Sequence, residues 1–177
     1  MTTVEEFRRL PESEACFLEL RNGEVIQVTR PKKRHDVVIY RIRRRLQPFA
    51  DEIGFFREEF TFRPLAEYEL RVADLAFVPW ERWDRVSDDD NLPGAPDFVV
   101  EAASPSNTAE ELQEKKQICL DNGCREFWIV YPKLEQIEVS TRDETRTYRR
   151  GSRIPLTVFA GHELSVDEIF AARAGQR

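Results

Sequence analysis

The chain has 177 residues, of which 41% are hydrophobic and 34% charged, a composition typical of globular rather than disordered proteins. This length predicts one domain, residues 1–177, large enough to bury a hydrophobic core. No apolar run approaches the ~20 residues of a membrane helix, and the first residues lack the pattern of a secretory signal. We therefore expect no membrane association and favour the cytoplasm.

Cysteine and histidine are scarce, with three and two copies respectively. Cys16, Cys119 and Cys124 form no Cys-x-x-Cys pair, so we expect reduced, packed thiols and no zinc site of the Cys and His type.

Basic residues gather between Arg30 and Arg45, where eight of them accompany one acid, although the formal net charge of the chain is −6. Such a block attracts polyanions, and His35, Arg41 and Arg44 are its candidate nucleic-acid contacts. The alternative is a helix face that is only solvated.

The N-terminal region predicts a short helix and a hairpin. Thr2 and Glu5 match a capping box. Asn22-Gly23 separates two short runs, 16–20 and 24–28, and is a strong hairpin signal.

The middle of the chain predicts a helix followed by strands. Apolar residues recur at three- and four-residue steps over 34–50, which is typical of a helix. Short strands are expected near 55–62. A longer strand is expected at 70–78, and from Val72 to Val78 both of its faces are apolar apart from Asp74, which indicates a central position in a sheet. Residues 81–95 form an acidic loop, and a strand follows at about 97–103.

The remaining pattern predicts a helix, a buried strand, a hairpin and a last short helix. Asn107 and Glu110 match a capping box for a helix that ends near Asn122-Gly123. The further elements are a strand at 126–131, a hairpin at 135–141 and 144–149, and a short helix capped by Ser165.

Two carboxylates interrupt apolar strands, Asp74 within 70–78 and Glu101 within 96–103. A buried charge costs several kcal/mol unless it is paired, hydrogen-bonded or bound to a metal. No basic residue adjoins either carboxylate in its run. A hydrated divalent cation shared by both is the expected partner. The alternative is a structural carboxylate that accepts backbone hydrogen bonds.

Several motifs occur in a fixed order along nearly the whole chain. They are Phe17-Leu-Glu-Leu-Arg-Asn-Gly-Glu24, His35 at the start of the basic helix, Arg71-Val-Ala-Asp-Leu-Ala-Phe-Val78, Asp97-Phe-Val-Val-Glu-Ala-Ala-Ser-Pro-Ser106, Glu111-x-x-x-Lys115, Gly123-Cys-Arg-Glu-Phe-Trp-Ile-Val130 and the terminal Leu-Ser-Val-Asp-Glu-Ile-Phe. Together they resemble the Uma-type restriction endonuclease family of the PD-(D/E)XK nuclease superfamily.

The resemblance implies an α/β fold in which a central mixed sheet is flanked by helices and extended by an N-terminal hairpin. It also implies a DNA endonuclease that uses Mg²⁺ or Mn²⁺. Its metal ligands would be Asp74, Glu101 and the backbone carbonyl of Ala102, and Glu19 and Lys115 would complete the catalytic set. A homodimer is plausible, because two sites can cut two strands.

Two departures from the superfamily pattern leave alternatives open. Ala73 stands in place of the expected proline, and Ala103 in place of the expected lysine. Lys115 matches the family position of a substitute lysine, but helical geometry alone does not choose between Lys115 and Lys116. Glu111 lies one turn before Lys115, so a simple helix ion pair is the competing interpretation. The protein could also be an inactive nuclease-fold module that binds nucleic acid or assembles, or an interaction domain.

Overall fold

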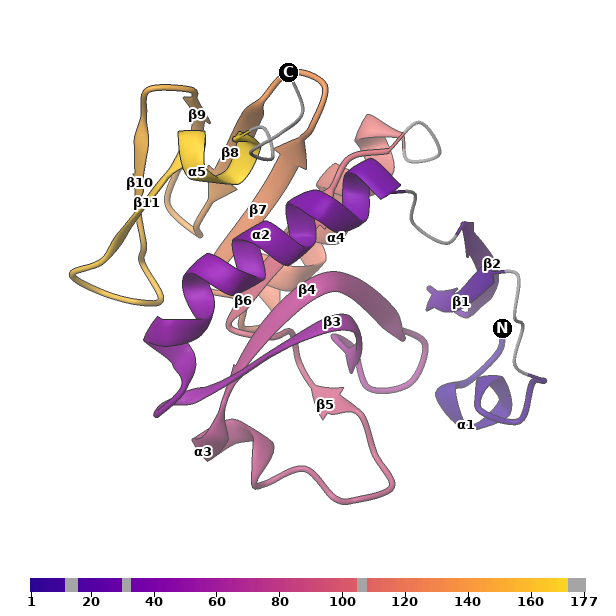
Figure 1. Cartoon of the computed structure of the whole chain (residues 1–177). Coiled ribbons are helices and arrows are strands. Elements are labelled where there is room, and N and C mark those ends of the chain that lie inside the picture. Colours follow the sequence, from indigo (N-terminus) through magenta and orange to yellow (C-terminus); the bar gives the residue numbers. More distant parts are fainter. Residues whose placement is uncertain (12–15, 30–32, 105–107, 172–177) are drawn as a thin grey trace.

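The computed structural model describes residues 1–11, 16–29, 33–104 and 108–171, and within them a mixed sheet of seven strands forms the centre of the molecule (Figure 1). The elements in chain order are α1 (Val4–Phe7), β1 (Cys16–Arg21), β2 (Glu24–Thr29), α2 (Lys33–Ala50), β3 (Gly54–Arg63), β4 (Arg71–Pro79), α3 (Trp80–Trp83), β5 (Leu92–Pro93), β6 (Phe98–Ala102), α4 (Ala109–Asp121), β7 (Glu126–Tyr131), β8 (Gln136–Ser140), β9 (Thr145–Arg149), β10 (Arg153–Pro155), β11 (Glu163–Ser165) and α5 (Val166–Phe170).

The strands of the large sheet follow the order β5-β3-β4-β6-β7-β8-β9. The pairs β3–β5 and β6–β7 are parallel, and the other neighbours are antiparallel. Strands β6 and β7 lie in the middle and are buried on both faces, which agrees with their nearly continuous apolar sequences. The predicted mixed sheet flanked by helices is confirmed.

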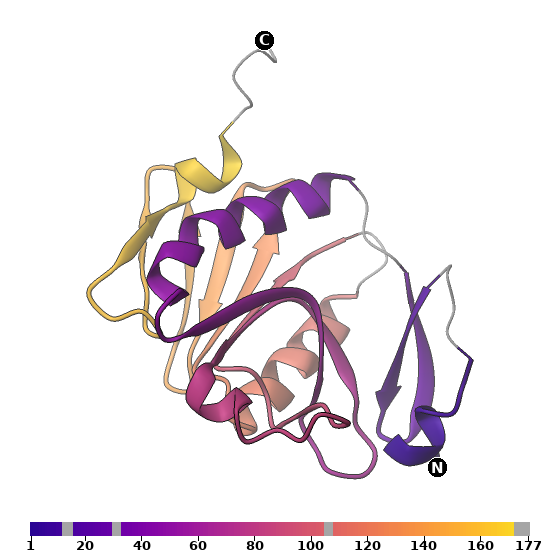
Figure 2. The ribbon, with the colours of Figure 1, turned by 60° about the horizontal axis from the view of Figure 1, so that its bottom comes forward.

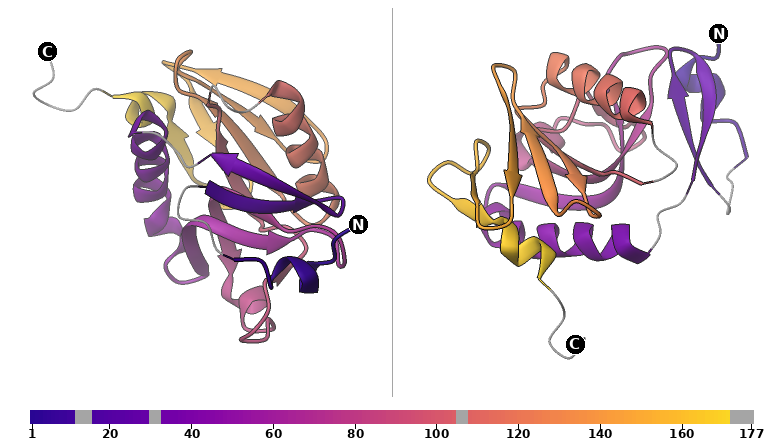
Figure 3. Two further views of the ribbon diagram at one scale, coloured as in Figure 1. Left: turned by 90° about the vertical axis from the view of Figure 1, so that its right-hand side faces the viewer. Right: turned by 90° about the horizontal axis from the view of Figure 1, so that it is seen from above.

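Helices α2 and α4 cover opposite faces of this sheet (Figures 2 and 3). The apolar stripe of α2, which includes Ile42 and Leu46, is fully buried in the core on one face. On the other face, α4 buries Leu112 and Cys119. No helix in the described part of the chain is long and apolar enough to cross a lipid bilayer.

The hairpin β1–β2 forms a separate two-stranded sheet beside the core (Figure 3). Leu20 and Leu70 exchange backbone hydrogen bonds of 2.8 and 2.9 Å, which attach the hairpin to the residue that precedes β4. Val4 of α1 packs with both leucines in a small separate cluster. This attachment places Glu19, the residue before Leu20, against the start of β4, where its Oε1 accepts from the N–H of Val72 at 2.9 Å.

Both predicted capping boxes are wrong by one residue. The first helix is capped by Thr3 with Glu6, not by Thr2 with Glu5. Asn107 lies outside the described residues, and α4 is capped by Thr108 with Glu111.

Three other predictions on local structure need adjustment. The short strands expected near 55–62 are one ten-residue strand, β3. The acidic loop at 81–95 contains most of the short helix α3 and the two-residue strand β5. Ser165 occupies the N-cap position of α5 without a side-chain hydrogen bond.

Cys119 and Cys124 are buried free thiols, as expected.

Candidate active site

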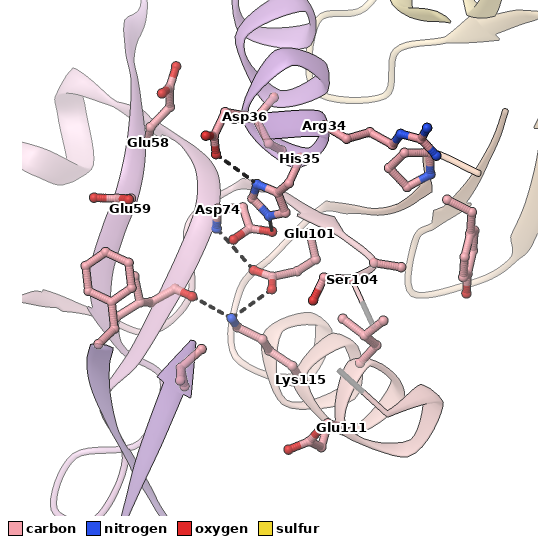
Figure 4. Close-up of a pocket in the computed structure, with 18 of the residues that line it drawn as sticks. Arg34, His35, Asp36, Glu58, Glu59, Asp74, Glu101, Ser104, Glu111 and Lys115 are labelled. Atoms are coloured by element: carbon pink, nitrogen blue, oxygen red, sulfur yellow. Dashed lines mark hydrogen bonds and ion pairs between the residues drawn. The ribbon is translucent and has the colours of Figure 1, made fainter. Parts of the chain in front are cut away.

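A cavity of about 1110 Å³ lies between the hairpin β1–β2, the first turns of α2, the N-terminal half of α4 and the end of β7 (Figure 4). Its described lining includes the sequence candidates Glu19, His35, Asp74, Glu101 and Lys115. Five candidates that are scattered over almost a hundred residues of sequence therefore converge on one space.

Asp74 and Glu101 are neighbours because β4 and β6 pair antiparallel, with Leu75 opposite Val100. The backbone N–H of Asp74 donates to Glu101 Oε1 at 3.3 Å. The backbone N–H of Ala102 donates to Asp74 Oδ2 at 2.8 Å. Each carboxylate is thus oriented by the backbone of the other strand.

Lys115 extends from α4 to the same point. Its Nζ donates to Glu101 Oε2 at 2.9 Å, to Glu19 Oε1 at 3.3 Å and to the carbonyl of Val72 at 2.5 Å. Lys116 instead pairs with Glu138 at 3.1 Å. The structure therefore brings Lys115, and not Lys116, to the two strand carboxylates.

The helix ion pair between Glu111 and Lys115 does not explain the position of Lys115. Glu111 caps its own helix through Thr108 and pairs with Arg21 Nη1 at 2.9 Å. Lys115 has its three partners on strands, so its place is set by the tertiary fold.

Glu19 is 1% exposed and acts as a buried connector. Its Oε1 accepts from the N–H of Val72 at 2.9 Å as well as from Lys115. Its Oε2 accepts from Arg21 Nε at 2.9 Å and lies 4.0 Å from Arg71 Nη1. Glu19 therefore reaches the site from the hairpin and holds Lys115.

Arg71 is a buried cation that the sequence analysis did not single out. It is 0% exposed and pairs with Glu69 at 2.7 Å and with Glu114 at 2.8 Å. The signal was present, because an arginine inside an apolar strand poses the same problem as Asp74 does. Its two close acidic partners come from just before β4 and from α4, so only the fold reveals the network.

His35, at the start of α2, contacts the site directly. Its Nε2 donates to Asp74 Oδ2 at 2.7 Å, and its Nδ1 lies 3.5 Å from Asp36 Oδ1 (Figure 4). Burial alone would lower the pKa of His35, but the hydrogen bond and the charge of Asp74 raise it. His35 thus orients Asp74.

Arg41 and Arg44, the other nucleic-acid candidates, do not line the cavity. Arg41 Nη1 donates to the carbonyl of Ile169 at 3.1 Å and so links α2 to α5, while Arg44 is exposed. Arg30 and Lys32 of the basic block lie outside the described residues. Among the described basic residues of this block, Arg34 lines the mouth of the cavity (Figure 4).

At the centre of the site the carboxyl groups of Asp74, Glu101 and Glu19 accompany the ammonium group of Lys115. Burial, followed by the charge of Asp74, raises the pKa of Glu101 to about 8, although Lys115 opposes this shift. Burial opposes the charge of Lys115, but Glu101 and Glu19 raise its pKa above the usual value. Burial also opposes ionisation of Glu19, yet Lys115 and the N–H of Val72 lower its pKa. The ammonium group therefore stays charged, and the site can accommodate further positive charge.

The donor set fits a hard divalent cation that keeps part of its hydration. Asp74 and Glu101 supply carboxylate oxygens, the ligands that Mg²⁺ and Mn²⁺ prefer. The described residues hold no group of three or more His, Cys, Asp or Glu side chains suited to a metal. A cation here would rest on two carboxylates, with water and a backbone carbonyl such as that of Ala102 as further ligands.

The sheet order and the flanking helices define a restriction-endonuclease-like fold. The chain belongs to the Uma2 family, whose model, described as "Putative restriction endonuclease", matches residues 4–167. The crystal structure of "a putative nuclease belonging to DUF820 from Anabaena variabilis ATCC 29413" superposes with a TM-score of 0.82. The match covers 96% of this chain and 98% of that one at 22% identity. No curated protein matches the chain. Family and fold support a nuclease function.

Proposed function

We propose that the protein is a divalent-metal-dependent endonuclease that hydrolyses phosphodiester bonds in DNA. The observation that carries the proposal is the convergence of Asp74, Glu101 and Lys115 in one cavity, with hydrogen bonds that fix each of them. Residues from β4, β6 and α4 meet there although no local sequence feature requires it.

Each residue of the site has a separate role in the proposed hydrolysis. Asp74 and Glu101 would hold Mg²⁺ or Mn²⁺, which when bound supplies an acidified water and neutralises phosphate charge. Lys115 donates hydrogen bonds, and its ammonium group can stabilise charge that develops on a phosphoryl oxygen. Glu19 is a positioning residue, because it accepts a hydrogen bond from Lys115 and so helps to hold the ammonium group in place. His35 keeps Asp74 oriented.

A plasmid-nicking assay tests this function. We expect the wild-type protein to cut plasmid DNA, supplied in supercoiled form and in single-stranded circular form, with Mn²⁺ or Mg²⁺, and to stop when a chelator is added. Glu101→Gln, which keeps the shape of the side chain, should lose the activity. Metal and DNA binding without nicking under any of these conditions would contradict catalysis and favour the inactive nuclease-fold module.

Arg34 should contribute to DNA affinity more than Arg44. Arg34 lines the mouth of the cavity, whereas Arg44 lies ten residues further along α2, or about 15 Å along its axis. Arg34→Glu should weaken DNA binding at low salt and make its salt dependence less steep, as expected when one phosphate contact is lost. Fluorescence anisotropy at several salt concentrations measures both quantities.

Arg44→Glu is the matched comparison for Arg34→Glu, since both variants change the net charge equally. Equal losses of affinity would extend DNA binding along α2 to the sequence candidate Arg44.

A further inference from the structure

The reactive groups lie deep in the cavity rather than on an open surface. Glu101 is 5% exposed and Lys115 is 7% exposed, while the side chain of Asp74 is 25% exposed. A phosphodiester must enter the cavity to reach them. Duplex DNA is stiff, with a persistence length of about 150 base pairs. A phosphate of an intact duplex therefore approaches the cavity only together with the partner strand and the stacked bases around it.

The size of the cavity points the same way. Its volume of about 1110 Å³ is close to the upper end of sites for small ligands, about 300–1,000 Å³. A space of this size suits a short stretch of one strand better than a turn of duplex.

Apolar side chains form much of the wall. Phe17 comes from β1, Tyr131 from the end of β7, and Leu134 from the turn that follows β7. Leu134 is 65% exposed although it borders the cavity. Aromatic and aliphatic walls favour the faces of unpaired bases. In a duplex those faces are stacked on neighbouring base pairs and cannot reach such a wall.

The charge of the wall also disfavours a duplex. Among the described residues that line the cavity, seven carboxylates accompany four lysine and arginine side chains. A duplex carries one phosphate charge per ~1.7 Å of its axis, about twice the density of one strand. Arg34 and Lys133 line the cavity and are exposed, so their charged groups can contact the phosphates of one DNA strand.

We propose that the substrate strand enters this cavity unpaired, so that the site acts on single-stranded DNA, including the single-stranded parts of flaps and gaps, in preference to continuous duplex. The inference rests on the proposed nuclease function for its cleavage step and on the shape and lining of the cavity for its binding step. Bases contact the wall formed by Tyr131 and Leu134, and the backbone passes Arg34 on its way to Lys115.

Cleavage and binding are measured separately to test this. With Mn²⁺, the wild-type protein is given one labelled sequence as a single strand, as a blunt duplex and as a duplex with a flap. We expect the strand and the flap to be cut at least about tenfold faster than the duplex, with cuts confined to unpaired nucleotides. A duplex cut as fast as the single strand would overturn the proposal.

Binding is measured by anisotropy with Glu101→Gln, so that no cleavage interferes. Tighter binding of the single strand supports the inference even if the wild type cuts nothing, an outcome that would refute the nuclease function alone. Equal or tighter binding of the duplex, or no binding of either form, overturns the inference.

Two variants with matched controls place the contact. Tyr131→Ala should weaken single-strand binding roughly tenfold, the scale of one lost stacked base. Tyr40→Ala, on the exposed side of α2, should not. Because Tyr131 also packs on the core, Leu134→Ser provides a second test at an exposed position, with exposed Leu65→Ser as its control. Unchanged affinity in both cavity variants would overturn the proposed wall contact.

Discussion

Lys115→Met is expected to cost about 3–5 kcal/mol in free energy of unfolding and to slow turnover by roughly 10²–10³. Methionine keeps the hydrocarbon length but removes the charge that neutralises Glu101 and Glu19, which are 5% and 1% exposed. Removing one partner of a buried ion pair leaves an uncompensated charge, which is the expensive case. Chemical denaturation measures the stability, and nicking rates below the unfolding transition measure turnover.

The loss of stability should depend on pH when metal is chelated. Burial raises the pKa of Glu101 from its usual 4.5 to about 8 in the folded protein, so the folded state retains a proton that the unfolded state has released. The free energy of unfolding therefore falls as pH rises from about 4.5 towards 8. In Lys115→Met it should fall further over this range, because Lys115 no longer opposes the rise in the pKa of Glu101. The double variant Lys115→Met with Glu101→Gln should recover much of the loss.

Lys116→Met is the control for Lys115→Met. Lys116 is adjacent in sequence, but its pair with Glu138 is more exposed, at 13% and 20% of the two side chains, than the pair of Lys115 with Glu101, at 9% and 6%, so its loss should cost less. Equal losses of stability and turnover in the two variants would contradict the role assigned to Lys115. So would a Lys115→Met protein that is as stable and as active as the wild type.

Asp74→Asn is expected to lower Mn²⁺ affinity by at least about 100-fold and to abolish nicking, while changing stability little. Even outer partners of metal ligands are worth about 10–100-fold in affinity, so a ligand should be worth at least the upper figure. The amide oxygen can still accept hydrogen bonds from His35 and Ala102, as Asp74 Oδ2 does. Titration calorimetry measures the affinity, and thermal unfolding measures the stability.

Asp97→Asn is the matched control for Asp74→Asn. Asp97 directly precedes β6, but its carboxylate pairs with Arg82 at 2.5 Å, away from the cavity. It should keep the wild-type Mn²⁺ affinity, even if the lost ion pair lowers stability. A stable Asp74→Asn protein with wild-type affinity would remove Asp74 from the metal site.

The order of elements and the two strand carboxylates could be predicted from the sequence because each leaves a local signal. The apolar spacing of 34–50 predicts α2. Asp74 and Glu101 stand out as charges inside apolar runs, and this signal does not depend on knowing how the strands pair. The positions of the caps could not be predicted. Thr2 with Glu5 and Thr3 with Glu6 match the same pattern. The observed cap is Thr3 with Glu6, and it occurs together with the burial of Val4 against Leu20 and Leu70.

The choice between Lys115 and Lys116 also depends on tertiary structure. Both residues fall within the broad arc of α4 that could face the core, so periodicity does not separate them. The packing of α4 against the sheet does, because it directs Lys115 to Glu101 and leaves Lys116 with Glu138. The Arg71 network was missed for a related reason, since its partners Glu114 and Glu19 come from α4 and β1.

A crystal structure grown with Mn²⁺, with anomalous data collected near the manganese absorption edge, would show whether Asp74 and Glu101 hold a divalent cation beside Lys115. We expect an anomalous peak in contact with oxygens of both carboxylates, with Lys115 close by. Absence of a peak at saturating Mn²⁺, with Lys115 still bound to Glu101 and His35 still bound to Asp74, would contradict this expectation and leave the two acids as structural carboxylates.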